Sequence, residues 1–286
     1  MSLRELLSDT AQDEGQASKT YGVVIGIVTN NKDPKDLGRV KVKFPWLQTS
    51  DESHWSRIAA PMAGPDRGAF FLPEVGDHVL AAFEHGDINY PIVLGALWTL
   101  NQRPPFNNAD GKNNVRAIKS RSGHVLIFDD NHEENKEKII IRTNKGYEII
   151  LNDGAEKISI MTTGGHQAVL DDANKEISIK TKEGNHLFLN DEIHRIQLST
   201  SDGHMMVLDD ESKAIIISDF ALENTIDIAY GVHEITIASM SGNIKLQAPK
   251  GKISLSAKEI QTTSTTSTKI EAGGTTDIKG KVVNIN

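Results

Sequence analysis

The sequence contains no cysteine, and aromatic residues make up only 5% of it. Without cysteine, neither a disulfide framework nor a cysteine-ligated metal site can hold the fold together. No apolar run approaches the roughly 20 residues that a membrane-spanning helix needs. The opening segment, MSLRELLSDTAQDEGQ, also lacks the apolar core of a signal peptide. We therefore expect synthesis in the cytoplasm.

An excess of basic residues is missing as well, since the net charge is -8. This charge disfavours sequence-independent binding to nucleic acid, because such binding needs Lys and Arg side chains to neutralise phosphates. The sequence contains no Ser/His/Asp nucleophile motif, no Walker loop and no HExxH. It therefore predicts a protein that is not an enzyme and takes no cofactor.

What the chain does contain is a short repeat between residues 143 and 219. Its glycines recur every 19 residues, at Gly146, Gly165, Gly184 and Gly203. One leucine and one isoleucine keep the same step: Leu151, Leu170, Leu189 and Leu208, and Ile158, Ile177, Ile196 and Ile215. A looser copy with a longer turn begins at Ser122. A fixed period of about 20 residues is typical of a stacked repeat architecture.

Each unit predicts a strand after the glycine, a turn at an Asn/Asp-Asp pair and a second strand. In the first strand both faces carry apolar residues, for example Leu170 on one face and Val169 on the other. A lone sheet of this kind would be insoluble, so something must cover it. We expect three chains to wrap around a common axis, with the repeated leucines and isoleucines (Leu151, Leu170, Leu189, Leu208, Ile158, Ile177, Ile196 and Ile215) in the trimer core.

Short strands separated by Gly and Pro fill residues 21–100, and five or six of them can close into a small barrel. Four successive segments stand out: GRVKVKFPW, HWSRIAAPMAGPDRG, PEVGDHVLAAFEHGD and PIVLGAL. In this order they resemble the OB-fold of the VgrG and phage spike-protein family. One departure is His78, which follows VGD where the family usually has an acidic residue.

The resemblance implies an all-β chain, with an OB-fold barrel followed by a trimeric intertwined β-helix or β-prism needle. The predicted parts are a tail (1–20), the barrel (21–100), a linker (101–114), the repeats (115–240) and a narrowing tip of short β segments (241–286). The tail is interpreted either as a mobile linker or as a docking peptide.

The implied function is that of a structural spike, which punctures a membrane at the tube tip of a contractile injection system. Such systems include phage tails, type VI secretion and phage-like particles, so the chain would belong to an assembled particle or baseplate. The implied partners are two further copies, a hub or baseplate ring at the barrel end, a PAAR-repeat tip protein at the C-terminal end and the target cell envelope. The family usually has a hub domain before the barrel and places any effector after the tip. We therefore expect either a separate hub protein or a chain from which the hub domain has been removed, and no effector.

Three sets of residues are candidate sites. His124, His166 and His204 follow the repeat glycine and would form imidazole rings in a trimer, which could bind zinc. Tyr147 and Asn185 interrupt this column, so we predict no metal there. The acidic pairs favour turns over calcium, which needs six to eight oxygens around one point; only the loop DDNHEEN (129–135) is a plausible ion site. These pairs are Asp129-Asp130, Asn152-Asp153, Asp171-Asp172, Asn190-Asp191 and Asp209-Asp210.

Trp46 and Trp55 form the third set, because OB-folds that bind single strands stack bases on aromatic rings in a basic groove. Arg39, Lys41 and Lys43 supply only three positive charges, so we expect the tryptophans to pack or to contact a subunit. Two other functions stay open. A β-helical fibre, adhesin or carbohydrate-active protein would show acidic or aromatic clusters on neighbouring repeats, and a nucleic-acid binder would show salt-dependent binding to single strands.

Overall fold

The computed structural model describes residues 19–47, 52–134 and 136–284. They fall into two compact units, Met1–Arg121 and Ser122–Asn286. Apart from two single-turn 3-10 helices, η1 (Glu84–Gly86) and η2 (His132–Glu134), the regular structure of the described part consists of β-strands. The all-β prediction is therefore confirmed. The docking peptide considered for the N-terminal tail lies outside the described residues, except for its last two positions.

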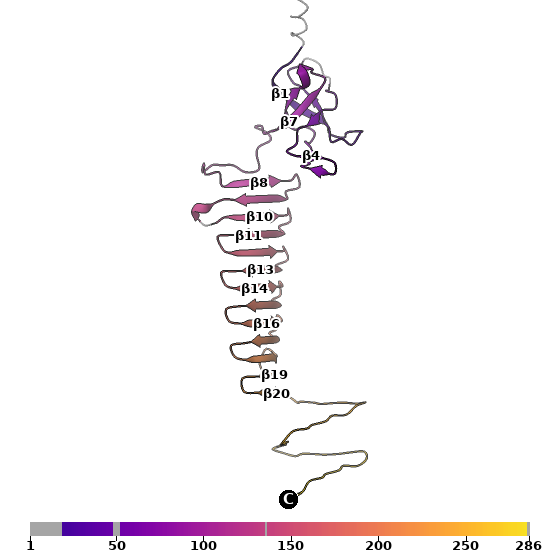
Figure 1. Cartoon of the computed structure of the whole chain (residues 1–286), viewed down its shortest axis with the longest axis vertical. Helices are drawn as coiled ribbons and strands as arrows, with labels where there is room; N and C mark the ends of the chain where they lie inside the picture. The colour runs from indigo at the N-terminus through magenta and orange to yellow at the C-terminus, as the bar shows by residue number, and fades with distance from the viewer. Residues whose placement is uncertain (1–18, 48–51, 135, 285–286) are drawn as a thin grey trace, which may run out of the picture. The chain divides into compact units, whose positions relative to one another are not determined.

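The first unit contains a small barrel (Figure 1). Its five-stranded sheet has the order β2-β1-β6-β7-β3. An isolated bridge between Val40 and Ser56 links the stretch before β2 to the stretch before β3, which brings the two edges together. The bounds are β1 (Val23–Asn30), β2 (Lys41–Lys43), β3 (Arg57–Ile58), β6 (His78–Phe83) and β7 (Pro91–Leu97), with a small hairpin of β4 (Ala63–Gly64) and β5 (Arg67–Gly68) between β3 and β6.

The barrel core follows from the period of two predicted for GRVKVKFPW. Val40 and Val42 have exposed fractions of 0%, and Phe44 of 3%, while the alternating residue Lys43 is exposed. Val28, Val79, Ala81, Phe83 and Val93 complete the buried cluster. Gly26 lies over this core, where an added Cβ would stand 2.2 Å from Val42 Cγ1. The strand passes so close to the core at this point that only glycine fits.

The second unit contains most of a 13-stranded sheet, which is a meander (Figure 1). Strands β9 to β20 pair antiparallel in succession, each with its neighbour in sequence, and β20 is the edge strand, as the repeat predicts. The bounds are β8 (Val115–Lys119), β9 (Val125–Asp129), β10 (Lys138–Arg142), β11 (Glu148–Asn152), β12 (Lys157–Met161), β13 (Gln167–Asp171), β14 (Glu176–Lys180), β15 (His186–Asn190), β16 (Arg195–Ser199), β17 (Met205–Asp209), β18 (Ala214–Ser218), β19 (Asn224–Ala229) and β20 (Glu234–Ser239).

Two kinds of hairpin turn alternate along this meander, and both use left-handed backbone. The first kind contains the repeat glycine, with φ between 88° and 100° at Gly146, Gly165, Gly184 and Gly203. The second kind follows the Asn/Asp-Asp pair and places a residue with a side chain at φ near 50°: Glu156, Lys175, His194 and Lys213. Positive φ lets a tight hairpin match the right-handed twist of its strands.

Residues 241–284 differ from the prediction of short β segments. In the single chain this described segment contains no strand, and its side chains are exposed except for Ala248. The residue types of the segment suit strands, but a strand also needs a hydrogen-bonded partner, and the chain does not supply one here.

Candidate interface of the repeat sheet

The strand register places the eight predicted core residues in one column. Leu151 lies directly opposite Ile158, Ile158 is also opposite Leu170, and Leu170 is opposite Ile177. The same pattern continues through Leu189, Ile196, Leu208 and Ile215. Directly opposite residues of an antiparallel pair lie on the same face of a sheet. The eight side chains therefore share one face, as the repeat predicts.

A second column on the same face was missed by the sequence reasoning as a set. It is shifted by two residues along each strand, and its members are Ile149, Ile160, Ala168, Ile179, Leu187, Leu198, Met206, Ile217, Ile226 and Ile237. The period of two within each strand was the signal that could have found it. We call the face with both columns the apolar face. From β11 to β18 every strand residue that points to it is aliphatic or Met, while β19 and β20 add Asn224 and Ser239 at one edge.

The apolar face is only half covered in the single chain. Leu170 is 43% exposed, and Ile177 is 44% exposed. Contiguous apolar surface of this length is unusual on a monomeric soluble protein and marks an interaction surface.

The opposite face of the sheet carries apolar residues such as Val169 and Val207 at the strand centres and polar or charged residues toward the strand ends, and we call it the ionic face. Cross-strand ion pairs join Arg142 to Glu148, Lys138 to Asp129 and Arg195 to Asp209. Arg195 Nε donates to Asp209 Oδ2 at 2.9 Å, and the Ser212 amide donates to Asp209 Oδ1 at 2.8 Å. These donors favour the charged carboxylate, so the pKa of Asp209 is lowered to about 2, with the Ser212 amide as the largest cause.

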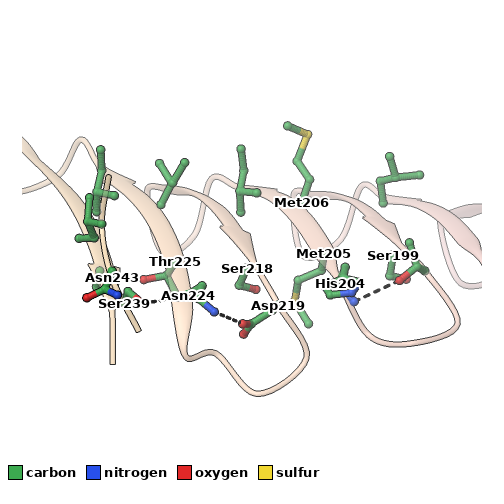
Figure 2. Close-up of a pocket in the computed structure, with 17 residues that line it drawn as sticks. Ser199, His204, Met205, Met206, Ser218, Asp219, Asn224, Thr225, Ser239 and Asn243 are labelled. Atoms are coloured by element: carbon green, nitrogen blue, oxygen red, sulfur yellow. Dashed lines mark hydrogen bonds between the residues drawn. The ribbon is translucent and has the colours of Figure 1, made fainter. Parts of the chain in front are cut away.

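Figure 2 shows side chains on both faces of the sheet at β16 to β20. Met206 points to one side of the sheet, while Met205 and Ser218 point to the other. A shallow depression here takes in aliphatic side chains such as Ile217, Ile226 and Ile237.

The Asn/Asp-Asp pairs act as turn residues. The first member accepts a backbone amide within its own turn, as when Asn174 N donates to Asp171 Oδ1 at 3.0 Å. The second member uses its own amide to reach the previous turn of the same kind, so Asp172 N donates to Glu156 O at 2.9 Å. Asp153, Asp191 and Asp210 repeat this second contact. The pairs therefore cap each turn and join successive turns into a ladder.

The repeat histidines join the glycine turns in a similar way. His166 Nδ1 accepts the amide of Lys182 at 3.3 Å, and His124 Nδ1 accepts the amide of Asn144 at 3.2 Å. Asn185 Oδ1 takes the same role by accepting the amide of Ser201 at 3.1 Å. Asn can replace His at this position because both offer an acceptor at the same reach. The interruption of the histidine column at Asn185 is thus explained by hydrogen bonding to the next turn.

Within the described ranges, no group of three or more His, Asp or Glu side chains is placed to hold a metal ion. In the acidic loop, Glu137 contacts the His132 ring. A hydrogen bond from the Glu137 backbone and this ring together lower the pKa of the Glu137 carboxyl. The part of the chain that the structure describes also has no helix long and apolar enough to cross a membrane.

The basic residues Arg39 and Lys41 of the barrel are both paired with acidic residues of the same unit. Arg39 Nε and an Arg39 amino group donate to Asp33 at 2.8 and 2.7 Å, and this contact strongly lowers the pKa of the Asp33 carboxyl. Lys41 Nζ lies 3.1 Å from Glu52. Both cations also lie over the Trp55 ring, at 5.9 and 5.7 Å from its centroid. Trp55 therefore packs against side chains of its own unit, as expected, and these contacts compete with any base or phosphate.

Trp46 lies in a different environment. It is 48% exposed, and its ring centroid is 6.4 Å from that of Phe44. Together with Val24, Ile25 and Pro45 it lines a shallow apolar hollow on the barrel. A role in subunit contact remains a prediction for this residue.

Comparison with known proteins gives matches to one group. Residues 24–98 match the model of the type VI secretion system/phage-baseplate injector OB domain. The type VI secretion system spike protein VgrG3 of Vibrio cholerae is 29% identical over 124 residues, which are 41% of this chain and 12% of that protein. The spike protein VgrG2a of Pseudomonas aeruginosa is 37% identical over 90 residues, 30% of this chain and 11% of that protein.

A third relative is the actin cross-linking toxin VgrG1 of Vibrio cholerae. It is 30% identical over 125 residues, which are 41% of this chain and 11% of that protein. The chain thus matches only about a tenth of the length of these relatives. The recognised part is the injector-type OB domain, and the relatives that share it include structural spike proteins.

Proposed function

We propose that this chain, which carries the OB domain found in type VI secretion and phage-baseplate injectors, is the structural spike of a contractile injection system. The observation that carries the proposal is the apolar face of the repeat sheet, in a chain that also contains such a barrel. Two aliphatic columns along most of the meander need a cover, and three copies can cover each other around one axis. The needle would then puncture a membrane at the tip of the inner tube.

The meander suits such a mechanical task. Each inner strand of β9 to β20 is hydrogen-bonded on both sides within its own chain, so each chain brings a complete sheet to the trimer. Strands lie about 4.8 Å apart along the stack, and load along the stack passes through these ladders. In a trimer the apolar faces would form a common core. Bending one sheet would then require the core to be opened as well, which stiffens the needle.

The partners follow from the same proposal. A hub or baseplate ring would hold the barrel end, and a PAAR-repeat protein would cap the other end. The target cell envelope would be the structure that the spike punctures. The chain itself would act without catalysis, without cofactor and without nucleic acid. The protein would be located in an assembled injection particle or baseplate.

Sedimentation velocity and negative-stain microscopy of the purified chain test this proposal together. We expect a stable trimer with the form of a thin rod that has one bulky end. A stable monomer at micromolar concentration would contradict it. Glycan-array binding by a monomer or by isolated fibres would instead support the adhesin alternative, and salt-dependent binding to single strands would support the nucleic-acid alternative.

A further inference from the structure

The barrel carries an apolar hollow beside its first strand, β1. The hollow has a volume of about 560 Å³ and is lined by Thr20, Val24, Ile25, Pro45 and Trp46. Ile25 is 52% exposed and Trp46 is 48% exposed, and the adjoining Val23, on the same face of β1 as Ile25, is 57% exposed. Within the described residues this apolar surface therefore stays about half uncovered. Apolar surface gathered in one place marks a site where another segment packs.

The described chain begins at the rim of this hollow. The Thr20 amide donates to the Gly86 carbonyl at 3.0 Å, which fastens the start of the chain to η1. A Cβ added to Gly86 would stand 3.1 Å from Lys19 Cβ, so Lys19 also lies against this turn. Thr20 is itself one of the lining residues. Residues 1–18, which lie outside the described part, are therefore attached to the barrel directly beside the hollow.

The sequence of this tail places its large apolar side chains on one helical face. Leu3, Leu6 and Leu7 have the spacing i, i+3 and i+4, which brings them together in a helix. Ser2 followed by Glu5 is the capping-box pattern that favours a helix start at this point. A helix of so few residues is not stable alone in water and needs a surface for its apolar face.

The tail is also long enough to reach the hollow. Twelve residues separate Leu7 from Thr20, and most of them belong to the polar stretch SDTAQDEGQAS. A linker of this length and composition spans about 20 Å on average. Such a tether holds the leucines at an effective concentration in the millimolar range around the hollow. Even a weak apolar contact is then populated within one chain.

We propose that residues 2–7 dock in the hollow of their own barrel, as a short amphipathic helix whose three leucines cover Ile25 and Trp46. The docked tail shields the most exposed apolar surface beside β1 and limits association through it. This inference goes beyond the proposed spike function and does not depend on the trimer, which forms through the apolar face of the repeat sheet. A second copy of the chain is the competing occupant of the hollow.

The absence of cysteine from the sequence allows a test by disulfide trapping in the full chain. Leu6→Cys/Ile25→Cys should form an intrachain disulfide under mild oxidation. The matched control is Leu6→Cys/Val75→Cys, because Val75 is an aliphatic residue of the same unit with a similar exposure of 59% and does not line the hollow. The first variant should react at least about tenfold faster, since docking raises the local thiol concentration only there. Equal rates would overturn the inference.

Two further outcomes are distinguishable. Disulfides between chains in Leu6→Cys/Ile25→Cys would show that the tail docks on a second copy, and the intrachain docking would be wrong. Hydrogen exchange needs no cysteine: in the unmodified protein the amides of residues 4–7 should exchange more slowly than in an unfolded peptide, and Trp46→Ser should remove this protection. Unprotected amides, or protection that survives Trp46→Ser, would overturn the inference. None of these results bears on the trimer, which sedimentation tests separately.

Discussion

A single charge on the apolar face should prevent assembly. In the single chain Leu170 lies opposite Ile158 and Ile177 and keeps 43% of its surface exposed. Full burial of a leucine side chain contributes about 2 kcal/mol, so covering the exposed part contributes about 1 kcal/mol per chain. An aspartate in the same place would lose this contribution. It would also have its pKa raised by about 3 units, which costs about 4 kcal/mol per chain.

Over three chains the predicted penalty of Leu170→Asp is about 15 kcal/mol. A trimer forms in two association steps, so the penalty is about 7 kcal/mol per step, which turns a nanomolar step of about -12 kcal/mol into one weaker than the about -8 kcal/mol of micromolar affinity. Sedimentation velocity at micromolar concentration should therefore show a monomer. The matched control is Ser178→Asp, which adds the same charge on the neighbouring strand but on the ionic face. Ser178 Oγ lies 2.8 Å from His186 Nε2, so a carboxylate there gains a partner, and the trimer should persist.

The assignment of the inner face would be refuted if Leu170→Asp remained trimeric. If in addition Ser178→Asp dissociated, the ionic face would be the one inside. Circular dichroism of both variants shows whether the sheet itself has survived. The register supports this survival, since neither change removes a backbone donor or acceptor.

Three further substitutions test the turns and the ionic face by chemical denaturation. Gly165→Ala should lower the free energy of unfolding by about 1–2 kcal/mol, because φ is 88° and the new Cβ would stand 3.2 Å from Lys182 Cγ in the next turn. The control Gly164→Ala, whose new Cβ would have its nearest contact at 3.5 Å, should be nearly neutral. Lys175→Asn should raise stability by up to about 1 kcal/mol, because Asn tolerates the left-handed backbone found there at φ 52°; an unchanged or lower stability would contradict this view of the turn. Asp209→Asn should remove part of the acid sensitivity. The folded pKa of about 2 lies below the ordinary value of 3.8, so the carboxylate stabilises the fold above pH 4, and this contribution disappears as the pH falls from about 4 to 2. Equal acid sensitivity in both proteins would contradict this role.

The sequence predicted the parts of the fold that follow from periodicity. The alternation of Val40, Val42 and Phe44 gave the buried side of the barrel, and the step of 19 residues gave the succession of hairpins. It also gave the shared face of residues such as Leu170 and Ile177. These predictions succeed because a side chain's face in a strand depends only on parity and register, and both can be counted along the chain.

The remaining features could not be predicted from the periodicity of the sequence. The amide of Asp172 reaches the carbonyl of Glu156, and the ring of His166 reaches the amide of Lys182, through stacking of turns that are far apart in sequence. Such contacts depend on how the hairpins lie above one another. The absence of strands in residues 241–284 was missed for a related reason. Composition indicates where a strand is favourable, but it does not indicate which chain provides the partner.

The turns, the ionic face and the apolar face of the repeat unit have different structural roles. The turns fix the register through backbone and Asx hydrogen bonds within one chain, so they need no partner. The ionic face satisfies its charges by cross-strand pairs such as Arg195 with Asp209. The apolar face is left half exposed, in a similar way from one hairpin to the next. Association through that face therefore does not depend on any single residue type beyond aliphatic character. This explains why Leu, Ile, Met and Ala can alternate along it, while the turn glycine recurs unchanged in the four units with Gly146, Gly165, Gly184 and Gly203.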